Sequence, residues 1–363
     1  MAIDAHALAS QRTGVGTYVA KLLDGIRENG DAGEVDLYLM EPAPEAEGFH
    51  TILLPRTPLW TTVRLAGHFA RNSAPEVMLY PAHSRPLYSP ARSVVTLHDL
   101  AFRLYPDHFT AADRLRLNLV TMHAARRADH FIANSETTRR DACDLLGIPP
   151  DRITTIHHGY DADFFRPASA ARIAEVRRRF RLDRPYLICV ATLQKRKNHE
   201  RLIEAVHRLH RRGYDLDLVL VGGRGWLYDG IYRRVEELGM EERVRFTGYV
   251  ALDDLPALYS GAEASVLVSL YEGFGLPVLE ALGCGVPTVV SDVSSLPEVG
   301  GDAVVKVDPM DPDSIAEGLE AVLVDSQLRR RLEERRIPQL QRFSWSLTAA
   351  RTLDVMRAVA SSA

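Results

Sequence analysis

The sequence predicts an α/β protein with a parallel sheet in each of two domains. Short apolar runs rich in β-branched residues alternate with helical patterns along the chain, as βαβ units require. The length of 363 residues exceeds what one core usually supports and favours two domains. The runs expected to form strands, besides a short first strand, are 93–99, 130–135, 152–159, 186–192, 216–223, 243–249, 263–269 and 287–292.

Composition indicates a soluble globular protein, with 46% hydrophobic and 25% charged residues. The net charge of -4 gives no support for a nucleic-acid partner. Cys143, Cys189 and Cys284 match no metal-ligand spacing, and no HExxH or paired CxxC motif occurs, so we expect no metal and a reduced environment. Without a signal sequence or an apolar run of membrane-spanning length, the chain is expected to be cytoplasmic.

A domain boundary is expected in the stretch 161–180, where a proline and small residues precede a basic helical pattern. The last 21 residues form a separate amphipathic helix in this interpretation. The expected divisions are an N-terminal domain over 1–167, a C-terminal domain over 168–342, and a terminal helix over 343–363.

Two carboxylates bracket a glycine-rich loop that runs into a predicted helix. Glu272 lies in the loop and Glu280 lies about one turn inside the helix, which has Pro277 near its first position and Gly283 or Gly285 at its end. Loosened backbone at a helix start can present N–H groups to an anion. The alternative is an ordinary strand-to-helix turn with two solvated acids.

A basic cluster follows another predicted strand. Lys195, Arg196 and Lys197 stand between the strand at 186–192 and the next helix, where a diphosphate site is plausible. The alternative is a solvated charge cluster.

Two features of the first half carry weaker signals. The Gly14–Gly16 turn lacks the third glycine of a dinucleotide fingerprint, so a nicotinamide cofactor is not expected. His98 ends a predicted strand, where it would orient a sugar hydroxyl or move a proton, or serve as a buried structural histidine.

Together these stretches resemble a retaining, nucleotide-sugar-dependent glycosyltransferase of family 4 with the GT-B fold. Such proteins have two Rossmann-like domains whose parallel sheets face across a cleft. The resemblance covers nearly the whole chain and is strongest from 186 to about 310. It lies in the order of GVG at 14–16, LHD at 97–99, NSE at 134–136, HGYD at 158–161, QKRKN at 194–198, VGG at 221–223, GYV at 248–250 and the E-x7-E segment starting at 272.

For the donor, the resemblance assigns the two acids and the two cations to different parts of the ligand. Glu280 would bind ribose hydroxyls, and Glu272 would lie beside the donor sugar. Lys197, with Arg196, would neutralise the diphosphate. Many members have Gly-Arg where this chain has Ala191-Thr192, and Arg196 is therefore the candidate for the second cation.

The resemblance also implies backbone contacts. The backbone around Phe274, Gly275 and Leu276 would approach the sugar and phosphates. The backbone at Val250 would contact the base.

In the N-terminal, acceptor-binding domain, Gly16 would approach the phosphates and His98 would line the sugar pocket. His98 and Glu272 are the catalytic-site candidates, neither as a nucleophile. The terminal helix would pack back on this domain, and no cofactor beyond the nucleotide-sugar substrate is implied.

Three functions remain open. The first is transfer of a hexose, with mannose from GDP-mannose slightly preferred, to a glycan, a lipid-linked sugar or a small molecule. The second is a nucleotide-sugar epimerase or hydrolase of the same fold. The third is a non-catalytic nucleotide-sugar-binding module, which the presence of both acids and Lys197 disfavours.

Membrane contact is a separate hypothesis. The stretch 58–72 mixes Trp60, Leu65 and Phe69 with Arg64 and Arg71, as a helix at the inner face of a membrane would. The favoured alternative is an ordinary amphipathic helix packed on the first sheet.

Overall fold

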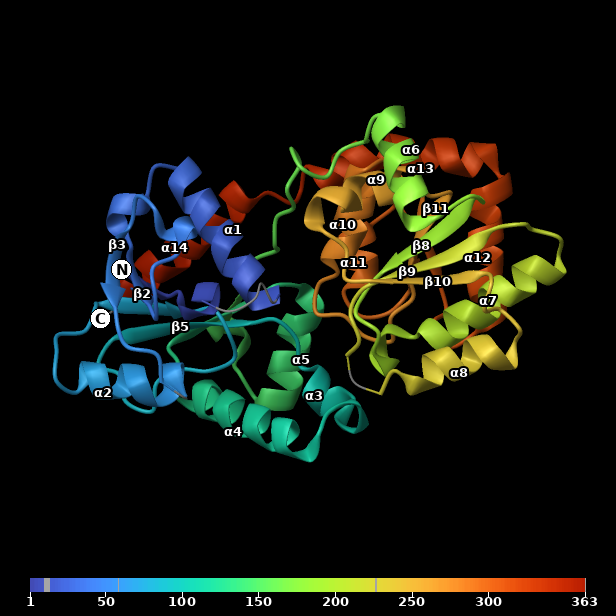
Figure 1. Ribbon diagram of the computed structural model, residues 1–363. Helices are drawn as coiled ribbons and strands as arrows, with labels where there is room; N and C mark the ends of the chain where they lie inside the picture. The colour runs from blue at the N-terminus through green and yellow to red at the C-terminus, as the bar shows by residue number, and fades with distance from the viewer. Residues whose placement is uncertain (10–13, 58, 226, 363) are drawn as a thin grey trace. The chain divides into compact units, whose positions relative to one another are not determined.

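The chain divides into two compact units (Figure 1). The computed structural model describes residues 1–9, 14–57, 59–225 and 227–362. Unit 1 comprises Met1–Gly159 and Phe343–Ala363, and unit 2 comprises Tyr160–Arg342. The C-terminal segment therefore belongs to the same unit as the N-terminal half.

Unit 1 holds a parallel sheet whose described strands run in the order β3-β2-β1-β4-β5-β6-β7. The sequential order reverses between β1 and β4, and such a switch point is where open α/β sheets bind ligands. The strands are β1 (Ala2–Asp4), β2 (Asp36–Leu39), β3 (His50–Leu53), β4 (Val77–Tyr80), β5 (Arg92–Leu97), β6 (His130–Ala133) and β7 (Ile153–Thr155).

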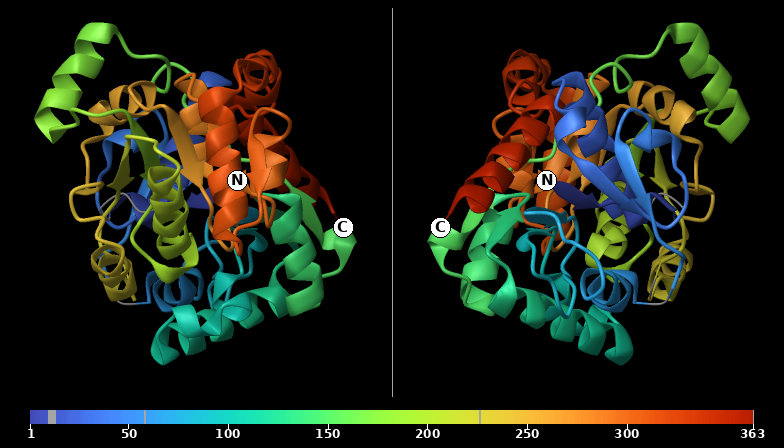
Figure 2. Two further views of the ribbon diagram at one scale, coloured as in Figure 1. Left: turned by 90° about the vertical axis from the view of Figure 1, so that its right-hand side faces the viewer. Right: turned by 90° about the vertical axis from the view of Figure 1, so that its left-hand side faces the viewer.

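Helices cover both faces of this sheet, as Figures 1 and 2 show. One face packs against α1 and α14, and the other packs against α2, α4 and α5. Side chains alternate between the two faces along each strand, so that Val77 and Leu79 join the first core and Met78 and Tyr80 the second. The helices are α1 (Gly14–Glu28), α2 (Leu65–Phe69), α3 (Ala101–Leu104), α4 (Ala111–Arg127), α5 (Glu136–Leu146) and α14 (Trp345–Ser361).

Close packing fixes α14 against α1. A Cβ atom on Gly25 would lie 2.4 Å from the carbonyl oxygen of Trp345, so only glycine lets the two backbones approach this closely. Leu353 and Met356 of α14 are fully buried in the same core.

Unit 2 is a second parallel sheet, with its described strands in the order β10-β9-β8-β11-β12-β13. Helices α7, α8 and α12 pack on one face, and α6, α9 and α10 pack on the other (Figure 1). The strands are β8 (Tyr186–Val190), β9 (Asp217–Val221), β10 (Val244–Gly248), β11 (Ala264–Leu267), β12 (Thr288–Ser291) and β13 (Val305–Val307). The helices are α6 (Ala170–Phe180), α7 (His199–Arg211), α8 (Asp229–Glu237), α9 (Leu255–Ser260), α10 (Leu276–Gly283), α11 (Leu296–Gly300), α12 (Pro312–Val324) and α13 (Ser326–Leu340).

The predicted α/β class and the eight named strands are confirmed. Four strands, β2, β3, β4 and β13, were not predicted from the sequence. These strands have three or four residues each, and three of the four residues of the edge strand β3 are exposed, so apolar periodicity gives little signal there.

The membrane-facing interpretation of the stretch 58–72 is wrong for the three apolar residues on which it rested, whereas Leu59 and Val63 are exposed. Pro58 lies outside the described residues. Trp60, Leu65 and Phe69 are 3%, 0% and 4% exposed and belong to a core of unit 1. The alternative, a helix packed on the first sheet, is confirmed. Over the ranges that the structure describes, no helix is both long and apolar enough to cross a membrane.

Candidate active site

The candidate site of unit 2 lies where the strand order reverses, between β8 and β11. These neighbours are parallel, so the loops that follow their carboxyl ends emerge at the same edge of the sheet. The loop after β8 carries Arg196 and Lys197 in a 3-10 turn, and the loop after β11 carries Glu272. The topology therefore brings together charges about 75 residues apart in sequence.

Glu272 is the centre of a buried ionic cluster. The Lys197 Nζ atom lies 2.5 Å from Oε1 of Glu272, and the Arg196 Nη1 atom lies 3.3 Å from Oε2. The Ser269 hydroxyl donates a further hydrogen bond of 2.7 Å to Oε1. All three charged side chains are mostly removed from water, with exposures of 9% for Glu272, 13% for Arg196 and 15% for Lys197.

These contacts decide the charge state of Glu272. Burial alone would raise the pKa of its carboxyl, but Lys197 and Arg196, with the Lys197 and Ser269 hydrogen bonds, outweigh burial and hold the pKa at about 2. The carboxylate is therefore ionised at neutral pH, and the cluster of two cations and one anion carries a net positive charge.

Backbone and amide contacts hold the two loops together. The Leu270 N–H donates to the carbonyl of Arg196 at 2.9 Å, and the Arg196 guanidinium donates to the carbonyl of Tyr271. Asn198 adopts a left-handed conformation with φ 61°, and its buried amide donates to the carbonyls of Val268 and Pro309. No role for Asn198 was predicted, because its position after a basic cluster does not indicate that its side chain bridges three loops.

A glycine in the left-handed region sets the entry into α10. Gly275 has φ 105°, and a Cβ atom there would lie 2.6 Å from Leu296. Leu276 then begins α10, with Pro277 in its first turn, as predicted. Phe274 and Val250 are 4% and 5% exposed, so their side chains are buried. The hydroxyl of Ser295 donates to the carbonyls of Glu272 and Phe274, which fixes the loop, and sequence analysis missed this serine too.

Glu280 stands apart from the ionic cluster in its hydrogen bonding. It is half-buried on α10, and its Oε2 accepts a hydrogen bond of 3.2 Å from the Tyr259 hydroxyl of α9. Burial raises the pKa of Glu280 to about 7, although the Tyr259 hydrogen bond acts in the opposite direction. This carboxyl is consequently poised between its neutral and charged forms near physiological pH.

In unit 1, His98 lies at the carboxyl end of β5 within a group of aromatic rings. Its Nε2 donates to the carbonyl of Pro81 at 2.7 Å, and its ring lies edge-on to Tyr18 at 5.0 Å and to His158 at 5.5 Å. Burial lowers the pKa of His98, so the imidazole is neutral at pH 7. Gly16 is buried in the first turn of α1.

No group of three or more His, Cys, Asp or Glu side chains that could hold a metal occurs in the described ranges of the chain. The absence of a cofactor requirement stays a prediction.

Two family models match the chain. Residues 12–164 match the model described as Glycosyltransferase Family 4, and residues 173–337 match Glycosyl transferases group 1.

Three named relatives are glycosyltransferases. O-antigen chain mannosyltransferase B of Escherichia coli is 35% identical over 286 residues, which cover 77% of this chain and 74% of that protein. The serotype-specific mannosyltransferase WbdA of Escherichia coli is 32% identical over 272 residues, covering 73% of this chain but only 33% of WbdA. D-inositol 3-phosphate glycosyltransferase of Salinispora tropica is 35% identical over 245 residues, covering 63% of this chain and 50% of the relative.

Solved structures agree on the fold. HepE from Anabaena, in complex with UDP and glucose, superposes with a TM-score of 0.77 at 18% identity, covering 98% of both chains. Sucrose-phosphate synthase from Thermosynechococcus elongatus gives a TM-score of 0.76 at 21% identity, covering 99% of this chain and 98% of the other. With both family models and the Escherichia coli relative, these findings place the chain among the GT-B-fold glycosyltransferases of family 4.

Proposed function

We propose that this glycosyltransferase moves a hexose, mannose from GDP-mannose, to a hydroxyl group of a glycan, lipid-linked or small-molecule acceptor, with retention of configuration. The names of two relatives, a mannosyltransferase of O-antigen chains and a serotype-specific mannosyltransferase, support mannose. UDP in the HepE complex makes a uridine donor the competing choice for the base. The proposal includes no metal or other cofactor.

The observation that carries this proposal is the Lys197–Glu272–Arg196 cluster at the switch point of unit 2. Departure of a nucleoside diphosphate leaves negative charge on phosphate and positive character on the sugar. The two prepositioned cations stabilise the negative charge on phosphate, and the ionised Glu272 carboxylate stabilises the positive character on the sugar. Groups that need no reorganisation during the reaction are effective here, and one such donor typically contributes roughly 3 kcal/mol.

The other donor contacts follow the order of the ligand. Glu280 binds ribose hydroxyls, for which its ionised form is the stronger acceptor. The backbone at Phe274, Gly275 and Leu276 approaches the sugar and phosphates, and Val250 marks the base.

In this mechanism, the acceptor hydroxyl attacks from the face that the diphosphate leaves, without a covalent intermediate on the protein. His98, neutral at pH 7, lines the sugar pocket and orients a sugar hydroxyl. Its Nε2–H donates to the carbonyl of Pro81, so a sugar hydroxyl would have to meet the ring through Nδ1.

The test is a panel of nucleotide sugars carrying isotope-labelled hexose, incubated with the full chain and mixed acceptors. Label in a new glycoside from GDP-mannose, with the α-anomeric configuration of the donor kept, supports the proposal. Label recovered only as free sugar or as an epimer supports the hydrolase or epimerase alternative. Binding without turnover supports a non-catalytic module. Preference for a UDP-sugar would overturn the choice of base and leave transferase activity intact.

A further inference from the structure

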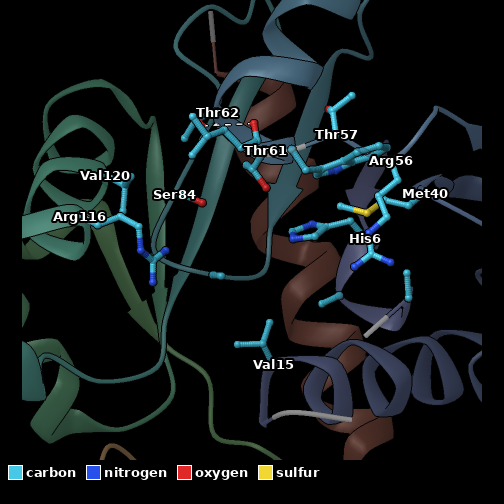
Figure 3. Close-up of a pocket in the computed structure, with 15 residues that line it drawn as sticks. His6, Val15, Met40, Arg56, Thr57, Thr61, Thr62, Ser84, Arg116 and Val120 are labelled. Carbon is cyan, nitrogen blue, oxygen red and sulfur yellow. Dashed lines mark hydrogen bonds between the residues drawn. The ribbon is translucent and has the colours of Figure 1, made fainter. Parts of the chain in front are cut away.

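Unit 1 has a cavity of about 690 Å³ of its own, at the switch point of its sheet. Residues that follow β1, β2 and β4 line it, including His6, Met40 and Ser84, and α4 closes another side with Arg116 and Val120. Figure 3 shows Arg116 on one side of the cavity and His6 and Arg56 on the other. The donor contacts proposed above do not use these side chains.

A buried carboxylate holds the cavity's histidine in place. Asp4, at the end of β1, is 1% exposed, and its Oδ1 lies 2.8 Å from Nδ1 of His6. Trp60 Nε1 and the Thr61 hydroxyl donate to the two oxygens of Asp4 at 2.9 and 2.7 Å. With Nδ1 bound to Asp4, the imidazole is oriented with Nε2 as its other polar atom. Burial disfavours the imidazolium, but the charge of Asp4 and its hydrogen bond together outweigh burial and raise the pKa of His6.

The lining combines positive charge with hydroxyl groups. His6, Arg56 and Arg116 supply N–H donors from opposite sides, and Thr57, Thr62 and Ser84 supply hydroxyls. None of the described residues that line the cavity is acidic. Outside the lining, the Asp113 Oδ1 atom lies 3.7 Å from the Nη2 atom of Arg116. Both side chains are exposed to water, so this ion pair holds the guanidinium only weakly.

We infer that this cavity binds the acceptor through a phosphate group on a saccharide, with Arg116, Arg56 and His6 as the phosphate-binding residues. A tetrahedral phosphate accepts hydrogen bonds from several directions, which suits donors on both sides of a cavity, whereas a planar carboxylate suits a single fork. The hydroxyl groups of Thr57, Thr62 and Ser84 suit the sugar ring. The inference rests on the proposed transferase function and specifies its acceptor class.

The test uses glucose 6-phosphate, glucuronate and methyl glucoside as probes, titrated into the full chain by isothermal calorimetry. The expected result is binding of glucose 6-phosphate alone. Arg116→Gln and His6→Gln should each weaken that binding by about tenfold, since a hydrogen bond to a charged group typically contributes about 1.5 kcal/mol or more. Arg114→Gln is the matched control, because Arg114 is an exposed arginine on the same helix that does not line the cavity.

Thermal unfolding of each variant and titration with GDP separate the possible failures. Arg116 is exposed, so its replacement should leave folding and GDP affinity unchanged. Equal affinity of Arg116→Gln and wild type for glucose 6-phosphate would overturn the inference, as would glucuronate binding as tightly as the phosphate. Either result alongside normal GDP binding leaves the proposed function standing, whereas failure to bind any nucleotide counts against that function alone.

Discussion

Glu272 and Glu280 are the same residue type in one short segment, yet their surroundings move their pKa values in opposite directions. Burial acts to raise the pKa of each carboxyl. Glu272 also has two cations and a serine hydroxyl, and its pKa falls to about 2. Glu280 has only the Tyr259 hydroxyl opposing burial, and its pKa rises to about 7. The partner, not burial, therefore determines which acid is permanently charged.

The largest expected effect comes from breaking the Glu272 cluster at its closest contact. Lys197→Ala should lower kcat/KM by roughly 100- to 1,000-fold, because it removes a prepositioned cation from the leaving diphosphate. Initial rates of labelled product formation measure this loss. The neighbouring exposed Lys195→Ala is the control and should keep its activity. Comparable losses of kcat/KM in both variants would mean that Lys197 has no specific role in stabilising the leaving diphosphate.

Removing the other acid tests the second half of the comparison. Glu280→Ala should weaken GDP binding by about 10- to 100-fold, since hydrogen bonds to a charged group contribute about 1.5–3 kcal/mol. Turnover at saturating donor should change much less. Calorimetry with GDP and a full kinetic profile separate the two quantities, and an unchanged affinity for GDP would remove Glu280 from the ribose contact.

Glu272→Gln keeps the shape of the cluster and frees its cations. We expect GDP, which lacks the sugar, to bind more tightly by on the order of fivefold, because Lys197 and Arg196 no longer share their charge with a carboxylate. Turnover of the donor sugar should fall in the same variant. GDP binding that weakens instead would show that Glu272 positions the cations rather than competing for them.

The last expected effect is on the pH dependence of stability. The folded pKa of Glu280 is raised, so its contribution to stability is complete below pH 4.5 and is lost as pH rises through about 7. Glu272 has a lowered pKa, so its contribution is present above pH 4.5 and is lost as pH falls through about 2. Thermal unfolding should therefore show Glu280→Gln more stable than wild type at pH 8 and similar at pH 5. A stability difference that does not change with pH would contradict the raised pKa.

Local sequence signals predicted much of the fold because they act through neighbours in the chain. Alternating apolar runs gave the named strands, and Pro277 with the glycines around it gave the start of α10. Short strands such as β3 and β13 were not predicted, because three or four residues are too few to show a periodic apolar pattern. The buried positions of Trp60, Leu65 and Phe69 agree with the favoured interpretation, but the pattern alone left a membrane-facing helix open, since an amphipathic pattern is the same whether its apolar face meets a sheet or a lipid.

The sequence by itself determined the α/β class and the alternation of strands and helices, and it identified Glu272, Glu280 and Lys197 as candidate site residues. Only the tertiary structure decided which charges meet. The reversal of strand order between β8 and β11 brings Lys197 and Arg196 to Glu272, and the end of β1 brings His6 and Trp60 to Asp4. Coulomb interactions depend on distance and on exclusion of water, which are properties of packing, so the opposite charge behaviour of Glu272 and Glu280 has no counterpart in the order of the letters.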